Sequence, residues 1–248
     1  MAGLALQIVE PAHDAYLVAV DLVHLKGKVI SGAATGLFFK WYSTLNIAAT
    51  TSQPELNAAH GADKLDLDAS LDVGSHVITL AAADQEHSDL DSIKAITRAA
   101  FAGGAPDPGN PTPCVVHRLR ATLRAPVEGG TLSKASAIVE MRAPVRWSKE
   151  EPAGSHVFIP DTEYRSMHKI QYRFELGPTG APDPTHTASV IVDLAAATFF
   201  RDGNTPYLRW QGALPAQLST GGHVLTLFVE KPDRTVQHSA SCHVSLIP

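Results

Sequence analysis

Gly74-Ser75-His76-Val77-Ile78-Thr79-Leu80 returns later in the chain in closely similar form, as Gly221-Gly222-His223-Val224-Leu225-Thr226-Leu227. In both copies the histidine and the larger apolar residues fall at every second position, which is the period of a strand with one buried face. A glycine opens each copy and suits the turn that leads into such a strand. The repetition predicts a duplicated chain in which each half contains an equivalent strand.

The repeated motif resembles the next-to-last strand of bacterial immunoglobulin-like and fibronectin-type-III-like domains. Each copy runs on to an acid, Asp84 or Asp233, and then to a further strand, as in that family. In immunoglobulin-like domains the residue at the position of His76 and His223 is typically a tyrosine that hydrogen-bonds back to nearby backbone. The resemblance therefore implies a β-sandwich and structural roles for His76 and His223, and it implies little about activity.

Length and composition agree with a duplicated globular protein. The chain has 248 residues, of which 44% are hydrophobic and 18% charged, as in ordinary folded domains. No segment shows sustained helical periodicity, so the predicted fold class is all-β. The resemblance of the repeated motif implies that the chain forms two immunoglobulin-like antiparallel β-sandwiches. The stretch AGGAPDPGNPTP at 102–113 is rich in proline and glycine and is predicted to be a linker. The predicted domains are therefore 1–101 and 114–248.

Strand alternation also predicts particular core and loop residues. Phe39 and Trp41 fall on one face of a strand, where Trp41 would be the central aromatic anchor of the first sandwich. The strand from Ile170 to Leu176 corresponds to it in the second half. Residues 147–168 have no counterpart in the first half and are predicted to form a loop insertion of the second sandwich.

Location and redox state are predicted from what the sequence lacks. The start of the chain has neither the basic residues nor the cleavage site of a signal peptide, and no apolar run is long enough to span a membrane. We expect a protein of the cytoplasm, or one assembled into a particle without a cleaved leader. Cys114 and Cys242 are expected to be reduced, half-buried thiols.

Motifs for metals, cofactors and catalysis are weak. None of the 12 histidines has the spacing of a zinc motif, and His238, Cys242 and His243 do not share one strand face. The row Asp63, Asp66, Asp68 and Asp72 is better explained as a solvated strand face than as a calcium site. Adjacent serine and histidine residues, as in Ser75-His76, point to opposite faces of a strand. The sequence predicts no metal, no cofactor and no enzyme activity.

Charge is unevenly divided along the chain. Residues 1–101 contain 6 basic and 12 acidic residues, whereas residues 114–248 contain 14 and 12, including ten of the eleven arginines. Arginine is suited to carboxylate recognition at interfaces. We therefore predict a partner-binding surface in the second half, formed by an outward arginine row and by the insertion: Arg118, Arg120, Arg124, Trp147, Lys149, Tyr164 and Arg165. The slight positive charge and the lack of interleaved aromatic residues argue against nucleic acid.

These features favour a non-catalytic structural or adaptor protein that binds other proteins, or copies of itself, in a larger assembly such as a phage-tail-like or secretion apparatus. One alternative is a carbohydrate-binding or adhesion module, in which Trp147, Tyr164 or Trp210 would form an aromatic platform for a glycan. The other is an enzyme with an unrecognised site in the loop 147–168.

Overall fold

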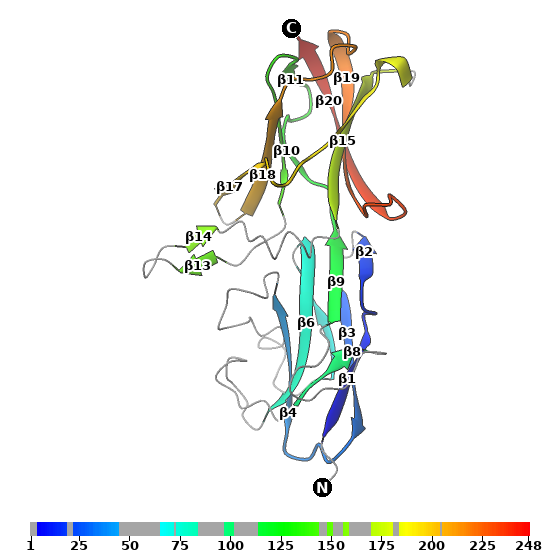
Figure 1. Cartoon of the computed structure of the whole chain (residues 1–248), viewed down its shortest axis with the longest axis vertical. Coiled ribbons are helices and arrows are strands. Elements are labelled where there is room, and N and C mark those ends of the chain that lie inside the picture. The colour runs from blue at the N-terminus through cyan, green and yellow to red at the C-terminus, as the bar shows by residue number, and fades with distance from the viewer. Residues whose placement is uncertain are drawn as a thin grey trace. The chain divides into compact units, whose positions relative to one another are not determined.

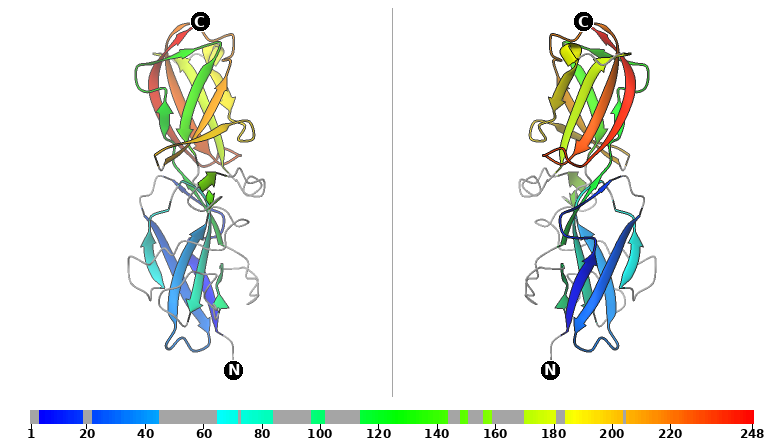
Figure 2. Two further views of the ribbon diagram at one scale, coloured as in Figure 1. Left: turned by 90° about the vertical axis from the view of Figure 1, so that its left-hand side faces the viewer. Right: turned by 90° about the vertical axis from the view of Figure 1, so that its right-hand side faces the viewer.

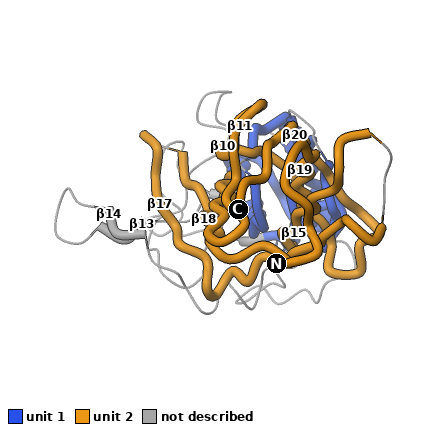
Figure 3. Tube along the Cα trace, turned by 90° about the horizontal axis from the view of Figure 1, so that it is seen from above, with its two compact units in different colours: residues 1–118, 146–167 blue, residues 119–145, 168–248 orange. Residues whose placement is uncertain are grey.

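The computed structural model forms two compact units (Figure 3), the first made of residues 1–118 and 146–167 and the second of residues 119–145 and 168–248. It describes residues 4–18, 22–44, 65–71, 73–83, 97–101, 114–143, 148–150, 156–158, 170–180, 184–203 and 205–248. These residues form β-strands and one short 3₁₀ helix, Pro184–His186, and contain no α-helix. The all-β prediction is confirmed.

Two larger sheets form the sandwich of the first unit (Figure 1). One has the strand order β5-β3-β1-β8, and the other has the order β2-β9-β6-β4 with β7 also paired to β6. Their bounds are β1 Ala5–Glu10, β2 Ala15–Val18, β3 Val23–Ser31, β4 Phe38–Thr44, β5 Asp66–Ala69, β6 Gly74–Ala83, β7 Thr97–Arg98, β8 Ala100–Phe101 and β9 Cys114–Leu119.

Trp41 lies at the centre of the core of this unit and is fully buried. It shares that core with alternate residues of β6, namely Ile78, Leu80 and Ala82, and with Leu25 of the other sheet. The two-residue period of the repeated motif thus places its apolar side chains on the inner face of a sandwich.

Strand β9 changes the domain boundary expected from the sequence. It pairs antiparallel with β6, and Ile78 lies opposite Cys114 and Gly74 opposite Arg118. Cys114–Leu119 therefore completes the first sandwich instead of opening the second. The predicted linker, residues 102–113, lies outside the described residues.

The second unit is a sandwich of two sheets (Figure 2), with strand orders β10-β12-β18-β17 and β11-β20-β19-β15-β16. Adjacent strands in these orders match the A-B-E-D and G-F-C arrangement of immunoglobulin domains, with an additional strand at each end of the second sheet. The bounds are β10 Leu123–Ala125, β11 Gly130–Ser133, β12 Ala137–Arg142, β15 Gln171–Pro178, β16 Ala188–Ile191, β17 Thr198–Asp202, β18 Thr205–Gly212, β19 Gly221–Glu230 and β20 Gln237–Ile247.

The predicted insertion lies between β12 and β15 in chain order. Its described part is a hairpin of β13, Ser148–Glu150, and β14, His156–Phe158. Residues 146–167 belong to the first compact unit, although the strands on either side of them belong to the second.

The two copies of the motif occupy the same place in their sheets. Trp41 lies opposite Leu80 on the β4–β6 pair, and Phe174 lies opposite Leu227 on the β15–β19 pair. On the other side, Cys242 of β20 lies opposite Leu225, just as Cys114 lies opposite Ile78. The opening glycines have φ values of +134° and +115°, which explains why glycine is present in both.

Candidate partner-binding surface

The predicted arginine row does not form. Arg118 ends the β9–β6 pairing, is only 5% exposed and donates to the carbonyl oxygen of Leu71. Arg120 is exposed between strands, and Arg124 lies in β10. The alternating sequence spans the end of one unit and the start of the next, so these residues do not share one strand.

Arg124 instead belongs to an ion-pair cluster on the outer face of the sheet β10-β12-β18-β17. Its Nε donates to Asp202 Oδ2 at 2.9 Å, and its Nη1 pairs with Glu140 Oε2. Arg209 Nε and Nη2 donate to the other oxygen of Glu140, at 2.8 and 2.6 Å. The buried Glu140 carboxylate therefore holds two arginines side by side, while their side chains remain 36% and 41% exposed.

Two aromatic rings support the same arginines. Phe200 and Tyr207 stack with their centroids 5.8 Å apart. The Arg124 guanidinium lies 5.4 Å from the centroid of each ring, and that of Arg209 lies 4.9 Å from the centroid of Phe200. Cation–π contacts and ion pairs fix the orientation of guanidinium groups that would otherwise be mobile. We call Arg124, Glu140, Phe200, Asp202, Tyr207 and Arg209 the arginine–aromatic surface.

The chemistry of this surface suits recognition of a carboxylate. Hydrogen bonds to Asp202 and Glu140 raise the pKa of Arg124, so it stays charged. Within the described residues, Arg124 Nη2 and Arg209 Nη1 have no hydrogen-bond acceptor. Both groups can donate to an incoming anion without breaking the cluster.

The remaining predicted contact residues give no support to this surface. Trp147, Tyr164 and Arg165 lie outside the described residues, and Lys149 is described only as part of the backbone of β13. Trp210 is not the exposed platform that a glycan site would need. Its ring packs edge-on against the fully buried Phe174, with the centroids 4.9 Å apart.

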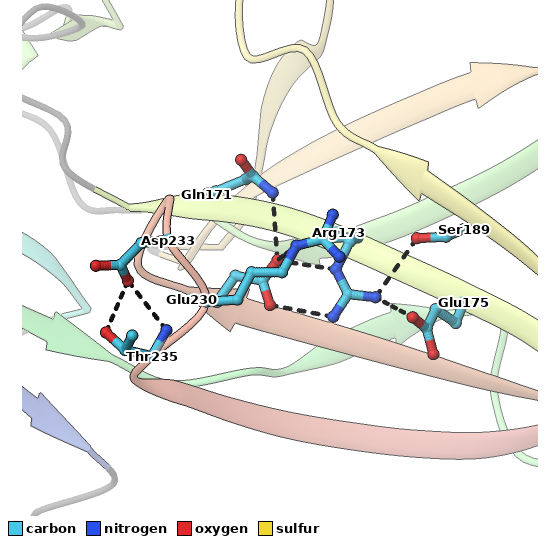
Figure 4. Close-up of polar contacts among 8 residues, drawn as sticks. Gln171, Arg173, Glu175, Ser189, Glu230, Asp233 and Thr235 are labelled. Carbon is cyan, nitrogen blue, oxygen red and sulfur yellow. Dashed lines mark hydrogen bonds and ion pairs between the residues drawn. The ribbon is translucent and has the colours of Figure 1, made fainter.

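A second arginine cluster, on β15 and β19, is buried and structural (Figure 4). Arg173 donates to both oxygens of the buried Glu230 carboxylate, at 2.8 and 3.1 Å, and also pairs with Glu175. Its guanidinium lies 4.2 Å from the centroid of the Phe228 ring. Because Arg173 is almost fully enclosed, it has no surface to offer a partner.

The motif histidines are both buried but have different partners. His76 Nδ1 shares a hydrogen bond of 2.7 Å with Ser43 Oγ across the β4–β6 pair. His223 Nδ1 lies 3.2 Å from the carbonyl oxygen of Gly221 and so makes a local backbone contact. In the described part of the chain no three His, Cys, Asp or Glu side chains gather as metal ligands would. No helix there is long and apolar enough to cross a membrane.

One constellation was not predicted from the sequence. Ser75 Oγ lies 2.9 Å from His117 Nδ1, and His117 Nε2 lies 3.3 Å from Asp14 Oδ1. The Tyr16 ring stacks on His117 at a centroid distance of 4.6 Å. The sequence has no motif that joins these three residues. Asp14 lies at a loop position with φ +60°, where the equivalent residue of the second unit is Gly129, at φ +74°. Backbone N–H groups establish this equivalence: Asp14 donates to Val115, and Gly129 donates to His243.

This serine–histidine–aspartate chain has the order of groups found in nucleophilic hydrolases. Its surroundings favour a structural role. Ser75 is only 6% exposed and His117 is fully buried, so a substrate carbonyl has little access to the hydroxyl.

No protein-family model and no curated protein matches this chain. Among solved structures, the Clostridium thermocellum CbhA fibronectin(III)-like modules align with 97% of this chain and 93% of that chain, at 11% sequence identity and a TM-score of 0.25. The class of the protein therefore rests on its own strand order and pairing. It is an all-β protein of two sandwich units, the second with the strand order of an immunoglobulin domain.

Proposed function

We propose that this chain is a non-catalytic binding protein, in which two immunoglobulin-like modules derived by duplication hold other proteins in a larger assembly. An apparatus of the phage-tail or secretion type is the kind of assembly that such a tandem array would suit. Each module supplies its own β-sheet framework, and the arginine–aromatic surface of the second module supplies the main contact.

The observation that carries this proposal is the half-exposed pair Arg124 and Arg209, held by Glu140 and stacked on Phe200 and Tyr207. Arginine and aromatic residues are enriched in protein interfaces and dominate their binding energy. Groups fixed before binding lose less conformational entropy when a partner arrives. A sheet face that is exposed only to solvent and binds no partner would not need side chains ordered in this way.

The test is a pull-down from the native host with the wild type and an Arg124→Ala, Arg209→Ala variant, followed by mass spectrometry. We expect stoichiometric protein partners that the variant loses. Arg234→Ala is the matched control, because it removes an exposed arginine of the same unit from the β19–β20 turn. If the Arg124→Ala, Arg209→Ala variant retains the same partners as the Arg234→Ala control, the contact lies elsewhere.

Catalysis is the competing function, because a series of hydrogen bonds links Ser75 to His117 and His117 to Asp14. A fluorophosphonate reagent distinguishes the two, since it labels activated serines. We expect Ser75 to remain unlabelled in the folded protein. Labelling that is lost in both Ser75→Ala and His117→Gln would make the first unit a hydrolase instead.

A further inference from the structure

The two arginines of the arginine–aromatic surface have a defined spacing. They bind the two different oxygens of one carboxylate, Glu140. The nitrogens that bind Glu140 are therefore no more than about 8 Å apart, which is two hydrogen-bond lengths plus the width of a carboxylate. A complementary partner would present two carboxylates at a similar spacing.

The first unit contains such a pair. Asp66 and Asp68 occupy alternate positions of β5, so both point to the same face, about 6.6 Å apart along the strand. Both are exposed, and the Asp68 side chain is 63% exposed even though it accepts a hydrogen bond from His24 at 2.9 Å. Lys26 lies opposite Asp66 in the strand register, but these two residues form no ion pair in the described structure.

Strand β5 lies at one edge of its sheet among the described strands. It is the terminal strand of the sheet β5-β3-β1-β8, so one of its backbone edges is unpaired within the sheet. Acidic residues on an edge strand prevent indiscriminate pairing with other strands while leaving the edge open to a partner of opposite charge.

The net charges of the two units also favour a contact between the acidic strand and the arginine–aromatic surface. The residues of the first unit include 10 basic and 17 acidic residues, and those of the second include 10 basic and 8 acidic residues. Opposite net charges on the two units favour contact between the first unit of one copy and the second unit of another.

We propose that the arginine–aromatic surface binds the acidic edge strand β5 of a second copy of this chain, with Asp66 and Asp68 facing Arg209 and Arg124. This inference rests on the proposed function and names its partner. Because the two contact surfaces differ, a copy that is bound through one of them still has the other available for a further copy. Such a head-to-tail contact gives open filaments, or rings where the rotation closes.

The experiment is sedimentation velocity of the purified full chain over a concentration series at low and high salt. We expect association beyond the dimer at low salt, and its loss near 1 M salt, where the screening length falls to about 3 Å. Two charge-reversal variants, Arg124→Glu with Arg209→Glu and Asp66→Lys with Asp68→Lys, should each self-associate at least about tenfold more weakly, because like charges then face each other.

Mixing these two variants is the decisive step. The first retains the acidic strand and the second retains the arginine surface, so together they restore one wild-type contact and should form a complex. The Asp66→Lys, Asp68→Lys variant, which changes only exposed positions, should also cap wild-type chains and shorten them. That result does not require the arginine variant to fold.

Wild-type protein that stays monomeric at low salt would overturn the inference, as would association unaffected by either reversal. Neither result bears on the host pull-down. A protein that captures other partners through Arg124 and Arg209 without self-association would retain the proposed function and refute only the second copy as partner.

Discussion

Trp41 fills the centre of the first sandwich and has no exposed surface. We expect Trp41→Ala to lower the free energy of unfolding of this unit by about 3 to 5 kcal/mol, the usual effect of emptying a large aromatic site. Chemical denaturation followed by circular dichroism measures it. Tyr16→Ala is a control from a half-buried aromatic position of the same unit and should have a smaller effect. A loss below about 1 kcal/mol for Trp41→Ala would contradict its role in the core.

Cys114 and Cys242 are free thiols, as expected, but both are buried and not half-buried. Burial, together with the nearby Asp14 carboxylate, raises the pKa of Cys114 to about 12. Burial also raises the pKa of Cys242, with a smaller effect of Glu128. Since the thiolate is the reactive form, we expect neither thiol to react with Ellman's reagent at pH 8 until the protein is unfolded. Rapid reaction of native Cys114 would show that its surroundings open readily.

Glu230 is fully buried and bound to Arg173 by two hydrogen bonds. Glu230→Ala would leave the Arg173 charge buried with much less compensation, so we expect a loss of stability of about 3 to 5 kcal/mol. The double variant Arg173→Met, Glu230→Leu removes both charges and should recover much of that loss. Thermal and urea unfolding of the wild type and of these two variants measures both losses of stability. Equal losses in the single and double variants would contradict an ion pair as the main contribution.

At the scale of strands, the boundary of the first sandwich leads to a direct test. A fragment of residues 1–101 lacks β9, so it leaves one side of β6 without its partner strand and lacks the buried core residues Cys114 and Val116. We expect this fragment to be unfolded or aggregated. A fragment of residues 1–119 contains β9 and should show dispersed amide resonances. If both fragments fold equally well, β9 contributes little to the first unit.

The sequence predicted the strands that have a clear two-residue period and missed what depends on pairing. The motif strands, β4 and β15 were predicted because alternation alone identifies a buried face. The partner of a strand is not encoded in its period, so Cys114–Leu119 was assigned to the sandwich that follows it in sequence. The composition of 102–113 is typical of a linker, but long loops within domains also contain such residues.

Less of the candidate site than of the fold could be predicted from the sequence. Arg124 was identified through the enrichment of arginine, whereas Glu140, Phe200 and Arg209 are brought to it from three other strands. Asp14, Ser75 and His117 are likewise distant in sequence and meet only through the fold. To predict contacts between residues this far apart, one must know which strands are neighbours in each sheet, and strand periodicity in the sequence does not give that order.

For the molecule as a whole, the second unit contains a pairing that bears on how the chain withstands tension. Strand β11 runs parallel to β20, with Gly130 opposite Val244 and Ser133 opposite Ile247. Force applied through the ends of this unit pulls β11 at its N-terminal end and β20 at its C-terminal end. Because the strands are parallel, this force is directed along them and acts on all the hydrogen bonds of the pair at the same time, in shear. Stretching single molecules should show a high rupture force for this unit, and Leu132→Pro, which removes a backbone donor from the pair, should lower it.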